Sequence, residues 1–285
     1  MNTSPRASSP RLHIFTTRLR RASTALATAL ALAFGALPAL EAFPNLDKLG
    51  DSLKKVQDTA GKAGRVVKGA TGLSLEEEVA IGDAVALEIV SRYGGLSRDE
   101  ALTTRVNLVG RSLARYALRQ DLQWRFAVLD SSEVNAFSAP GGRVFITRGL
   151  LELAPDDDRL AGILAHEIAH IDERHALRII ARGELFGGVS ALVADNNADF
   201  AQYEQVVSDI TSELLDKGFD PGTEYAADKL GRELAKTTGF APGGLRAVLT
   251  DLKASAAGKH EKTFSTHPPL DDRLQRLPKD PAPTG

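Results

Sequence analysis

Residues 156–170 read DDDRLAGILAHEIAH, and this stretch decides the fold that the chain can adopt. Its apolar residues recur at the spacing of one helix face, at Leu160, Ile163, Leu164 and Ile168. The aspartates that follow Pro155 offer an N-cap and a favourable charge for the first helical turn. The stretch therefore predicts a helix that begins near Asp156 and has one apolar face.

The last five residues of this stretch are His166-Glu167-Ile168-Ala169-His170. Residues four apart lie on the same helix face, so both imidazoles can point at one ion while Glu167 stands beside it. Two histidine ligands with an adjacent glutamate base are typical of zinc hydrolases. We therefore expect one Zn²⁺ per chain, bound by His166 and His170, with Glu167 as the catalytic base.

A catalytic zinc ion usually takes three protein ligands, so the two histidines need a partner. The chain contains no cysteine, which excludes a thiolate ligand. His175 lies five residues beyond His170, or about 140° around a continuous helix. Because Asp172-Glu173-Arg174 contains no glycine to break the helix, we expect His175 to have a structural or ligand-supporting role instead.

Glu224 is the better candidate for the third ligand. It begins Glu224-Tyr-Ala-Ala-Asp228, on a helix that Asp220-Pro221-Gly222 is expected to open. Glu224 and Asp228 share a helix face, so one carboxylate can bind the metal while the other accepts an imidazole N–H from a ligand. The alternative is an acidic helix face that is simply solvated.

The N-terminal segment has the pattern of a secretory signal. The first 21 residues carry five arginines and no acidic residue, and residues 22–40 are uncharged and rich in Ala and Leu. This order is typical of a signal peptide, with cleavage expected after Ala42. The alternative is a retained membrane anchor, because an uncharged run of 19 residues approaches the length that spans a bilayer.

Residues 43–73 form a separate zone in which leucines at helical spacing precede a stretch rich in glycine and lysine. This pattern predicts an amphipathic arm followed by a flexible linker. Residues 43–60 could associate peripherally with a membrane; the alternative is a loosely packed arm. Without residues 1–42 the chain has more acidic than basic residues, so no nucleic-acid partner is expected.

The remainder, residues 74–285, reads as one α+β domain that is mainly helical. Ser74 with Glu77, and Ser97 with Glu100, form capping boxes that predict two helices, the first running to about Tyr93 and the second towards Ala117. Residues 124–129 and 143–147 have strand character, and everything from Asp156 onward reads as helical. A small β-sheet and a dominant helical half follow from this order.

Four ordered motifs resemble the HtpX and CAAX-prenyl-protease type of zinc metallopeptidase. They are His166-Glu-Ile-Ala-His170 continuing to Arg174-His175, Glu224-x-x-Ala-Asp228, Asn135-Ala-Phe-Ser-Ala-Pro-Gly-Gly-Arg-Val-Phe-Ile146, and Thr266-His-Pro-Pro269 with Arg273. The resemblance covers about residues 75–277. Within this gluzincin family the chain resembles the soluble periplasmic branch. We expect it to lack the helical-repeat domain that some members of that branch carry.

The resemblance implies a zincin-type domain in which the edge strand of the sheet precedes the metal-binding helix. It implies that Glu224 completes the zinc site and that Asp228 steadies a ligand. It also implies that His267 can approach the zinc ion and inhibit the site; the alternative is that residues 266–269 form a rigid turn before the last helix. It also implies that Asn135 and an edge strand formed by residues 143–147, including Arg143, Val144 and Phe145, hold the substrate backbone.

These features together predict a secreted zinc endopeptidase of the periplasm that acts on unfolded or misassembled envelope proteins, the substrate class resting on the resemblance alone. The alternative is an envelope chaperone or assembly factor with little proteolysis. Peptide hydrolysis needs a donor for the developing oxyanion. His267, Arg273 and Tyr225 are the candidates, and the sequence does not choose among them.

Overall fold

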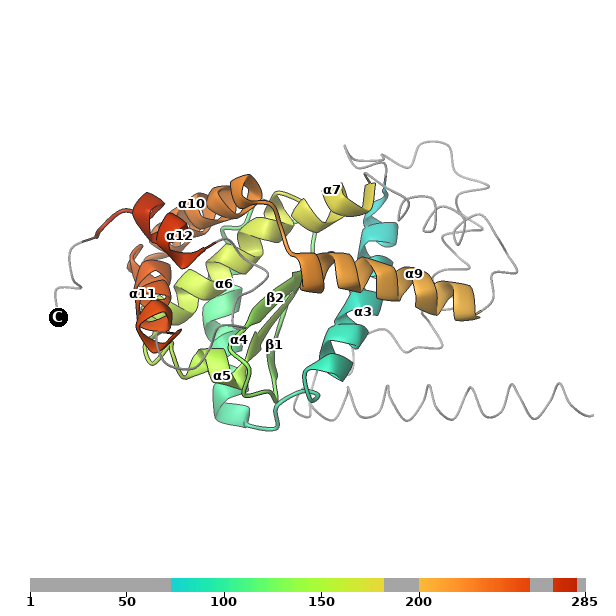
Figure 1. The fold of residues 1–285 in the computed structure, drawn as a ribbon, viewed down its shortest axis with the longest axis horizontal. Coiled ribbons are helices and arrows are strands. Elements are labelled where there is room, and N and C mark those ends of the chain that lie inside the picture. The colour runs from blue at the N-terminus through green and yellow to red at the C-terminus, as the bar shows by residue number, and fades with distance from the viewer. Residues whose placement is uncertain (1–72, 182–199, 257–268, 281–285) are drawn as a thin grey trace, which may run out of the picture. The chain divides into compact units, whose positions relative to one another are not determined.

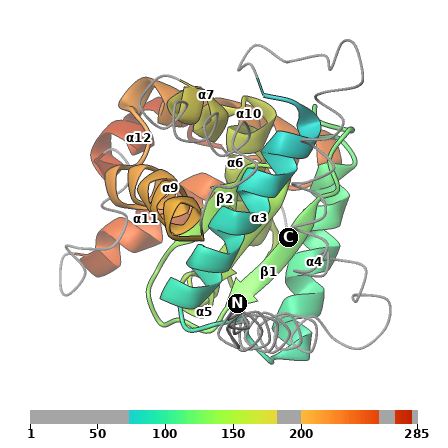
Figure 2. The ribbon, with the colours of Figure 1, turned by 90° about the vertical axis from the view of Figure 1, so that its right-hand side faces the viewer.

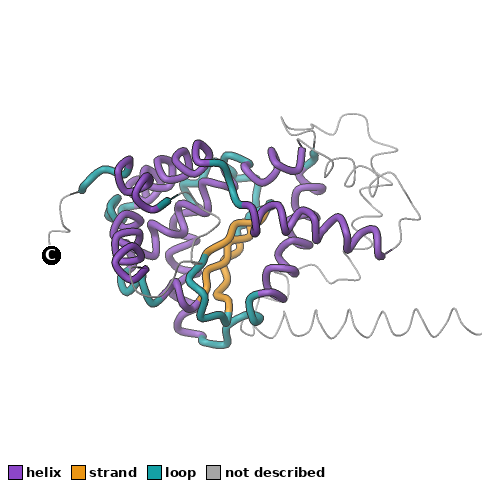
Figure 3. The backbone as a smooth tube through the Cα atoms, in the orientation of Figure 1, coloured by secondary structure: helices purple, strands orange, loops and turns teal. Residues whose placement is uncertain are grey.

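The structure, a computed structural model, describes residues 73–181, 200–256 and 269–280. The predicted signal peptide, the arm and His267 lie outside these residues. The helical elements are α3 (Leu75–Arg92), α4 (Glu100–Ala114), α5 (Arg148–Leu151), α6 (Asp157–Asp172), α7 (His175–Ala181), α9 (Phe200–Ser212), the π-helical turn η2 (Glu213–Lys217), α10 (Pro221–Thr238), α11 (Gly244–Ala256) and α12 (Leu270–Arg276). Helices dominate the described part of the chain (Figures 1 and 3), which confirms the predicted α+β class.

The sheet has three strands, β1 (Arg125–Leu129), β2 (Ala136–Ala139) and β3 (Arg143–Thr147), in the order β1-β3-β2. β3 pairs parallel with β1 and antiparallel with β2. The prediction that residues 143–147 form an edge strand is therefore wrong. The strand that the sequence analysis missed, β2, pairs with β3 across the Pro140–Gly142 turn and is an edge strand of the sheet, as β1 is on the other side.

The helix starts follow local capping chemistry. Ser74 and Glu77 form the predicted capping box of α3, and Asp156 and Asp220 cap α6 and α10 with their side chains. The prediction for α4 was wrong by two residues, because Asp99 rather than Ser97 caps this helix. The Ser97 hydroxyl instead accepts the Asp99 N–H at 3.2 Å.

Helix α6 is the centre of the described fold. Its residues from Leu160 to Ile171 are all buried, and α10 and α11 pack along it (Figures 1 and 2). Gly231 allows the close approach of α10, because a Cβ atom there would lie only 2.8 Å from the His166 backbone nitrogen. This contact brings the helix that carries Glu224 against the helix that carries both histidines.

The described part of the chain contains no helix that is both long enough and apolar enough to cross a bilayer. The uncharged run at residues 22–40 lies outside that part.

Candidate metal centre

His166, His170 and Glu224 converge into one buried cluster, and their potential ligand atoms all lie within 4.8 Å of one another. The two Nε2 atoms are 3.1 Å apart. Glu224 presents Oε2 at 3.5 Å from His166 Nε2 and Oε1 at 3.4 Å from His170 Nε2. Two helices thus deliver three side chains, none more than 3% exposed, to one point.

The donor set fits a zinc ion. Ligands about 2.0–2.1 Å from a shared zinc ion at tetrahedral angles lie roughly 3.4 Å from each other. The two histidine nitrogens are 3.1 Å apart, and each lies 3.4 or 3.5 Å from one of the two Glu224 oxygens, close to that value. Two imidazoles and one carboxylate are also the ligand set of many catalytic zinc sites.

The electrostatics of the cluster favour a cation. Burial and the nearby Arg273 act to lower the pKa of His166, but hydrogen bonds with Asp228 and Glu224 outweigh them and raise this pKa to about 9. Without a metal ion the two carboxylates therefore hold a proton on His166. A divalent cation in the cluster would take the place of the proton at His166 Nε2, beside Glu224.

Asp228 lies one helical turn beyond Glu224 and contacts the far nitrogen of His166. Its Oδ1 is 3.0 Å from His166 Nδ1. Burial acts to raise the pKa of Asp228, but hydrogen bonds with His166 and Arg273 lower it to about 2. An ionised carboxylate at Nδ1 fixes the ring and turns Nε2 towards the cluster.

Arg273, a candidate oxyanion donor in the sequence analysis, is fully buried behind this pair. Its Nε and NH2 groups donate to the two oxygens of Asp228 at 3.0 and 2.5 Å. NH2 also lies 3.5 Å from His166 Nδ1, on the side away from Nε2. In this geometry Arg273 supports the ligand pair, and its NH1 group lies 4.0 Å from Glu224 Oε2. Its oxyanion role stays a prediction.

His175 contacts the other histidine of the motif. Its Nδ1 lies 2.9 Å from His170 Nδ1, and burial lowers the pKa of His175 to about 4. The prediction that the metal helix continues through Arg174 was wrong, because α6 ends at Asp172 and α7 begins at His175. The predicted ligand-supporting placement of His175 nevertheless agrees with this contact.

Glu167 is 5% exposed and follows His166 on α6. Tyr225 is another candidate oxyanion donor. The guanidinium carbon of Arg276 lies over its ring, 4.1 Å from the centroid of the Tyr225 ring. His267 lies outside the described residues. The catalytic roles of these residues therefore stay predictions.

The predicted substrate residues divide into two groups. Arg143, Val144 and Phe145 are buried in the central strand β3, whose backbone pairs on both sides, so a peptide cannot add to it. Arg143 instead forms an ion pair with Asp83 of α3, at 2.6 Å. Asn135 precedes the edge strand, and its side-chain oxygen accepts the N–H of Ala136 at 2.9 Å.

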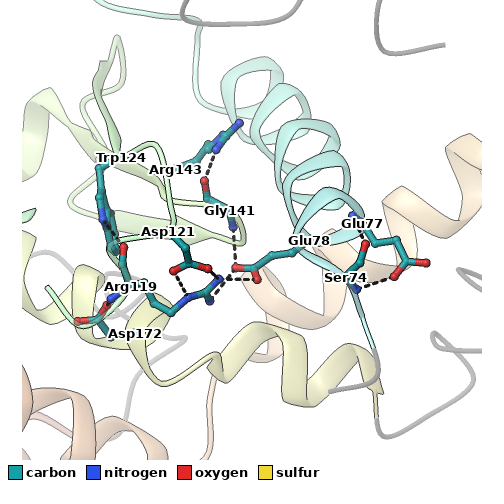
Figure 4. Close-up of polar contacts among 9 residues, drawn as sticks. All are labelled: Ser74, Glu77, Glu78, Arg119, Asp121, Trp124, Gly141, Arg143 and Asp172. Carbon is teal, nitrogen blue, oxygen red and sulfur yellow. Dashed lines mark hydrogen bonds and ion pairs between the residues drawn. The ribbon is translucent and has the colours of Figure 1, made fainter. Parts of the chain in front are cut away.

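A buried network that the sequence analysis missed holds the turn after β2. Glu78 of α3 accepts the Gly141 N–H at 3.2 Å and pairs with the Arg119 guanidinium at 3.0 Å (Figure 4). Gly82 of the same helix has no space for a Cβ atom, which would clash with the Pro140 carbonyl oxygen. These partners are 41 to 63 residues apart, so no local pattern signals them.

The helix-borne donor set and the small sheet beside it define a metallopeptidase domain of the zincin type. The sequence profile of peptidase family M48 matches residues 100–280. The chain belongs to this family.

Several curated proteins are similar to the chain. The Beta-barrel assembly-enhancing protease of Yersinia pestis is 27% identical over 217 residues, which cover 72% of this chain and 44% of that protein. The Protease HtpX homolog of Salinibacter ruber is 28% identical over 201 residues, covering 57% and 70%. The Metalloprotease YcaL of Escherichia coli K12 is 23% identical over 214 residues, covering 73% and 84%.

The chain spans about half the length of the assembly-enhancing proteases that it matches, 44% in Yersinia pestis and 46% in Escherichia coli K12.

Proposed function

We propose that this protein is a zinc-dependent endopeptidase in which His166, His170 and Glu224 hold the metal ion. The observation that carries the proposal is the convergence of three buried donors at distances that suit zinc. Membership of peptidase family M48 supports the same reaction.

Bound zinc supplies Lewis acidity, which lowers the pKa of water and polarises a peptide carbonyl. Glu167 takes the proton of the attacking water and delivers it to the amine that leaves. Asp228 holds the His166 ring through Nδ1, and Arg273 keeps Asp228 ionised and in place. The three donor side chains are at most 3% exposed, so bulk water is largely excluded from the cluster.

The substrate strand adds to β2 rather than to β3. Antiparallel pairing alternates, and Thr147 N–H donates to Asn135 C=O at 3.0 Å. By this alternation the backbone N–H and C=O groups of Phe137 and Ala139 also point towards β3. Those of Ala136 and Ser138 therefore point away from it. Because the Asn135 side-chain oxygen accepts the Ala136 N–H, the groups offered to a peptide are the Ala136 C=O and both the N–H and the C=O of Ser138.

We further propose that the protein acts in the periplasm on unfolded or misassembled envelope proteins. The arginine-rich start and uncharged run of residues 1–42 support export. The similarity to proteins named for β-barrel assembly supports envelope substrates. N-terminal sequencing of the protein from cells should find a new terminus near residue 43; an intact segment 22–40 would contradict a cleaved signal.

Replacement of Glu167 by Gln tests the enzymatic proposal. The variant should bind zinc as the wild type does but cleave an unfolded protein such as casein at least about 100-fold more slowly, because it lacks the base. Glu152→Gln, at an exposed position before α6, is the matched control and should keep full activity. Equal cleavage by wild type and Glu167→Gln would refute the role of Glu167.

An assembly factor with little proteolysis is the second candidate, because the similar proteins are named for enhancing assembly. The same variant separates the two in cells. If Glu167→Gln supports envelope assembly as well as the wild type does, binding rather than cleavage is the function.

A further inference from the structure

We propose that His175 is a positioning residue for the metal site, whose Nδ1 accepts the Nδ1–H of His170 and so fixes the orientation and tautomer of that ligand. The inference rests on the proposed function only in taking His170 as a metal ligand. It assigns His175 a specific hydrogen-bonding task that neither the motif nor the relatives' names supply.

The protons of the histidine pair can be assigned from the geometry. The two Nδ1 atoms are 2.9 Å apart, so one of them must donate and the other accept. His170 turns Nε2 towards the cluster, 3.1 Å from His166 Nε2, and a ligating nitrogen carries no proton. The proton of His170 therefore lies on Nδ1, and His175 is the acceptor with its own proton on Nε2.

The backbone between the two residues is shaped to make this contact. On a continuous helix His175 would lie about 140° around the axis from His170. Instead α6 ends at Asp172, and Arg174 has φ 55°, the only positive φ at a non-glycine position among the described residues. A left-handed residue other than Gly or Asn is strained and persists where its surroundings impose it. Here it turns His175 back onto His170.

The supports of the two ligands differ in charge. His166 has an ionised carboxylate, Asp228, at its Nδ1, whereas His170 has a neutral imidazole there. The ring of Phe219 completes the support of His170, stacking at a centroid distance of 4.4 Å and an angle of 18°. His175 therefore orients His170 without adding a buried negative charge of the kind that Asp228 places beside His166.

The test is the zinc dissociation constant of the full chain, measured by competition with a chromophoric chelator. His175→Leu removes the acceptor and should weaken zinc binding by about 10- to 100-fold. His175→Asn keeps an acceptor oxygen near the place of Nδ1 and should bind within about threefold of wild type. Arg174→Gly keeps the left-handed turn without its strain and should bind as the wild type does.

A wild-type dissociation constant for His175→Leu, with its fold verified by circular dichroism, would overturn the inference. A second measurement needs no variant: long-range ¹H–¹⁵N spectra of the zinc-loaded protein should find the proton of His170 on Nδ1 and that of His175 on Nε2. The reverse tautomer of His175 would also overturn it. If the wild type binds zinc but cleaves no protein, the endopeptidase proposal fails while this inference stands.

Discussion

At the residue scale, the proposed metal site depends on a chain of contacts from Arg273 through Asp228 to His166. Each member is at most 3% exposed, so none of the charges can be solvated if its partner is lost. These contacts therefore contribute both to the orientation of a ligand and to the stability of the domain.

Replacement of Asp228 by Ala removes the central carboxylate of this chain of contacts and should destabilise the domain. It leaves the guanidinium of Arg273 buried without its carboxylate, which typically costs about 3–5 kcal/mol. Urea unfolding of the metal-free protein measures the loss. Asp251→Ala breaks an exposed 3.4 Å pair with Arg159 and should cost less than about 0.5 kcal/mol. Equal effects of the two substitutions would contradict the buried chain of contacts.

The raised pKa of His166 predicts how the metal-free protein responds to pH. The pKa is about 9 in the fold, above its ordinary value of about 6.5, so protonated His166 stabilises the fold fully below pH 6.5. This contribution is lost as the pH rises through 9. Urea unfolding of metal-free protein should therefore find lower stability at pH 9.5 than at pH 6.5.

His166→Asn is the control for this titration and should remove most of that pH dependence. A stability that falls equally in the wild type and in the variant would assign the effect to another group.

At the element scale, the site depends on the packing of α10 against α6 and on the edge position of β2. The packing of α10 places Glu224. The edge position of β2 leaves the strand to which we propose that a peptide adds.

Replacement of Gly231 by Ala tests the helix contact. A Cβ atom there would lie 2.8 Å from the His166 nitrogen, so α10 must move away from α6. Overpacking of this kind costs about 1–3 kcal/mol, and the zinc affinity should fall because Glu224 moves with its helix. Gly222→Ala, near the start of α10 and close only to the Asp220 side chain, should change neither quantity.

Replacement of Ser138 by Pro tests the substrate strand. Proline removes an N–H that points away from β3, so the β2–β3 pairing should survive while one hydrogen bond to substrate is lost. A bond of about 1–1.5 kcal/mol predicts a roughly tenfold lower kcat/KM for peptide cleavage. Zinc content should not change. Ser138→Ala keeps the N–H and is the matched control; full activity of Ser138→Pro would contradict the proposed strand.

The sequence predicted the elements whose signals are local. The capping residues Ser74, Asp156 and Asp220 marked helix starts, and the strands 125–129 and 143–147 were found from their composition. Strand order was not predictable, because β2 is only four residues long and its pairing with β3 depends on tertiary contacts. The break at Arg174 was missed because a left-handed turn there has no glycine to signal it.

At the scale of the whole molecule, the clustering of the predicted ligands could be anticipated for a simple reason. Helical periodicity fixes which side chains share a face, so spacing alone pairs His166 with His170, and Glu224 with Asp228. To predict that the two pairs meet, with Glu224 54 positions after His170, required the motif order as well. The partners of Arg273 and Arg143 could not be found, since they lie 45 and 60 residues away with no pattern linking them.

The central claim is that one zinc ion is held by His166, His170 and Glu224, and bound-metal analysis of the purified protein tests it most directly. Inductively coupled plasma mass spectrometry should find about one zinc ion per chain in the wild type and in Glu167→Gln. Glu224→Ala should retain little zinc after dialysis, because two imidazoles alone bind it weakly. Undiminished zinc in Glu224→Ala, or no zinc in the wild type, would contradict the proposed metal site.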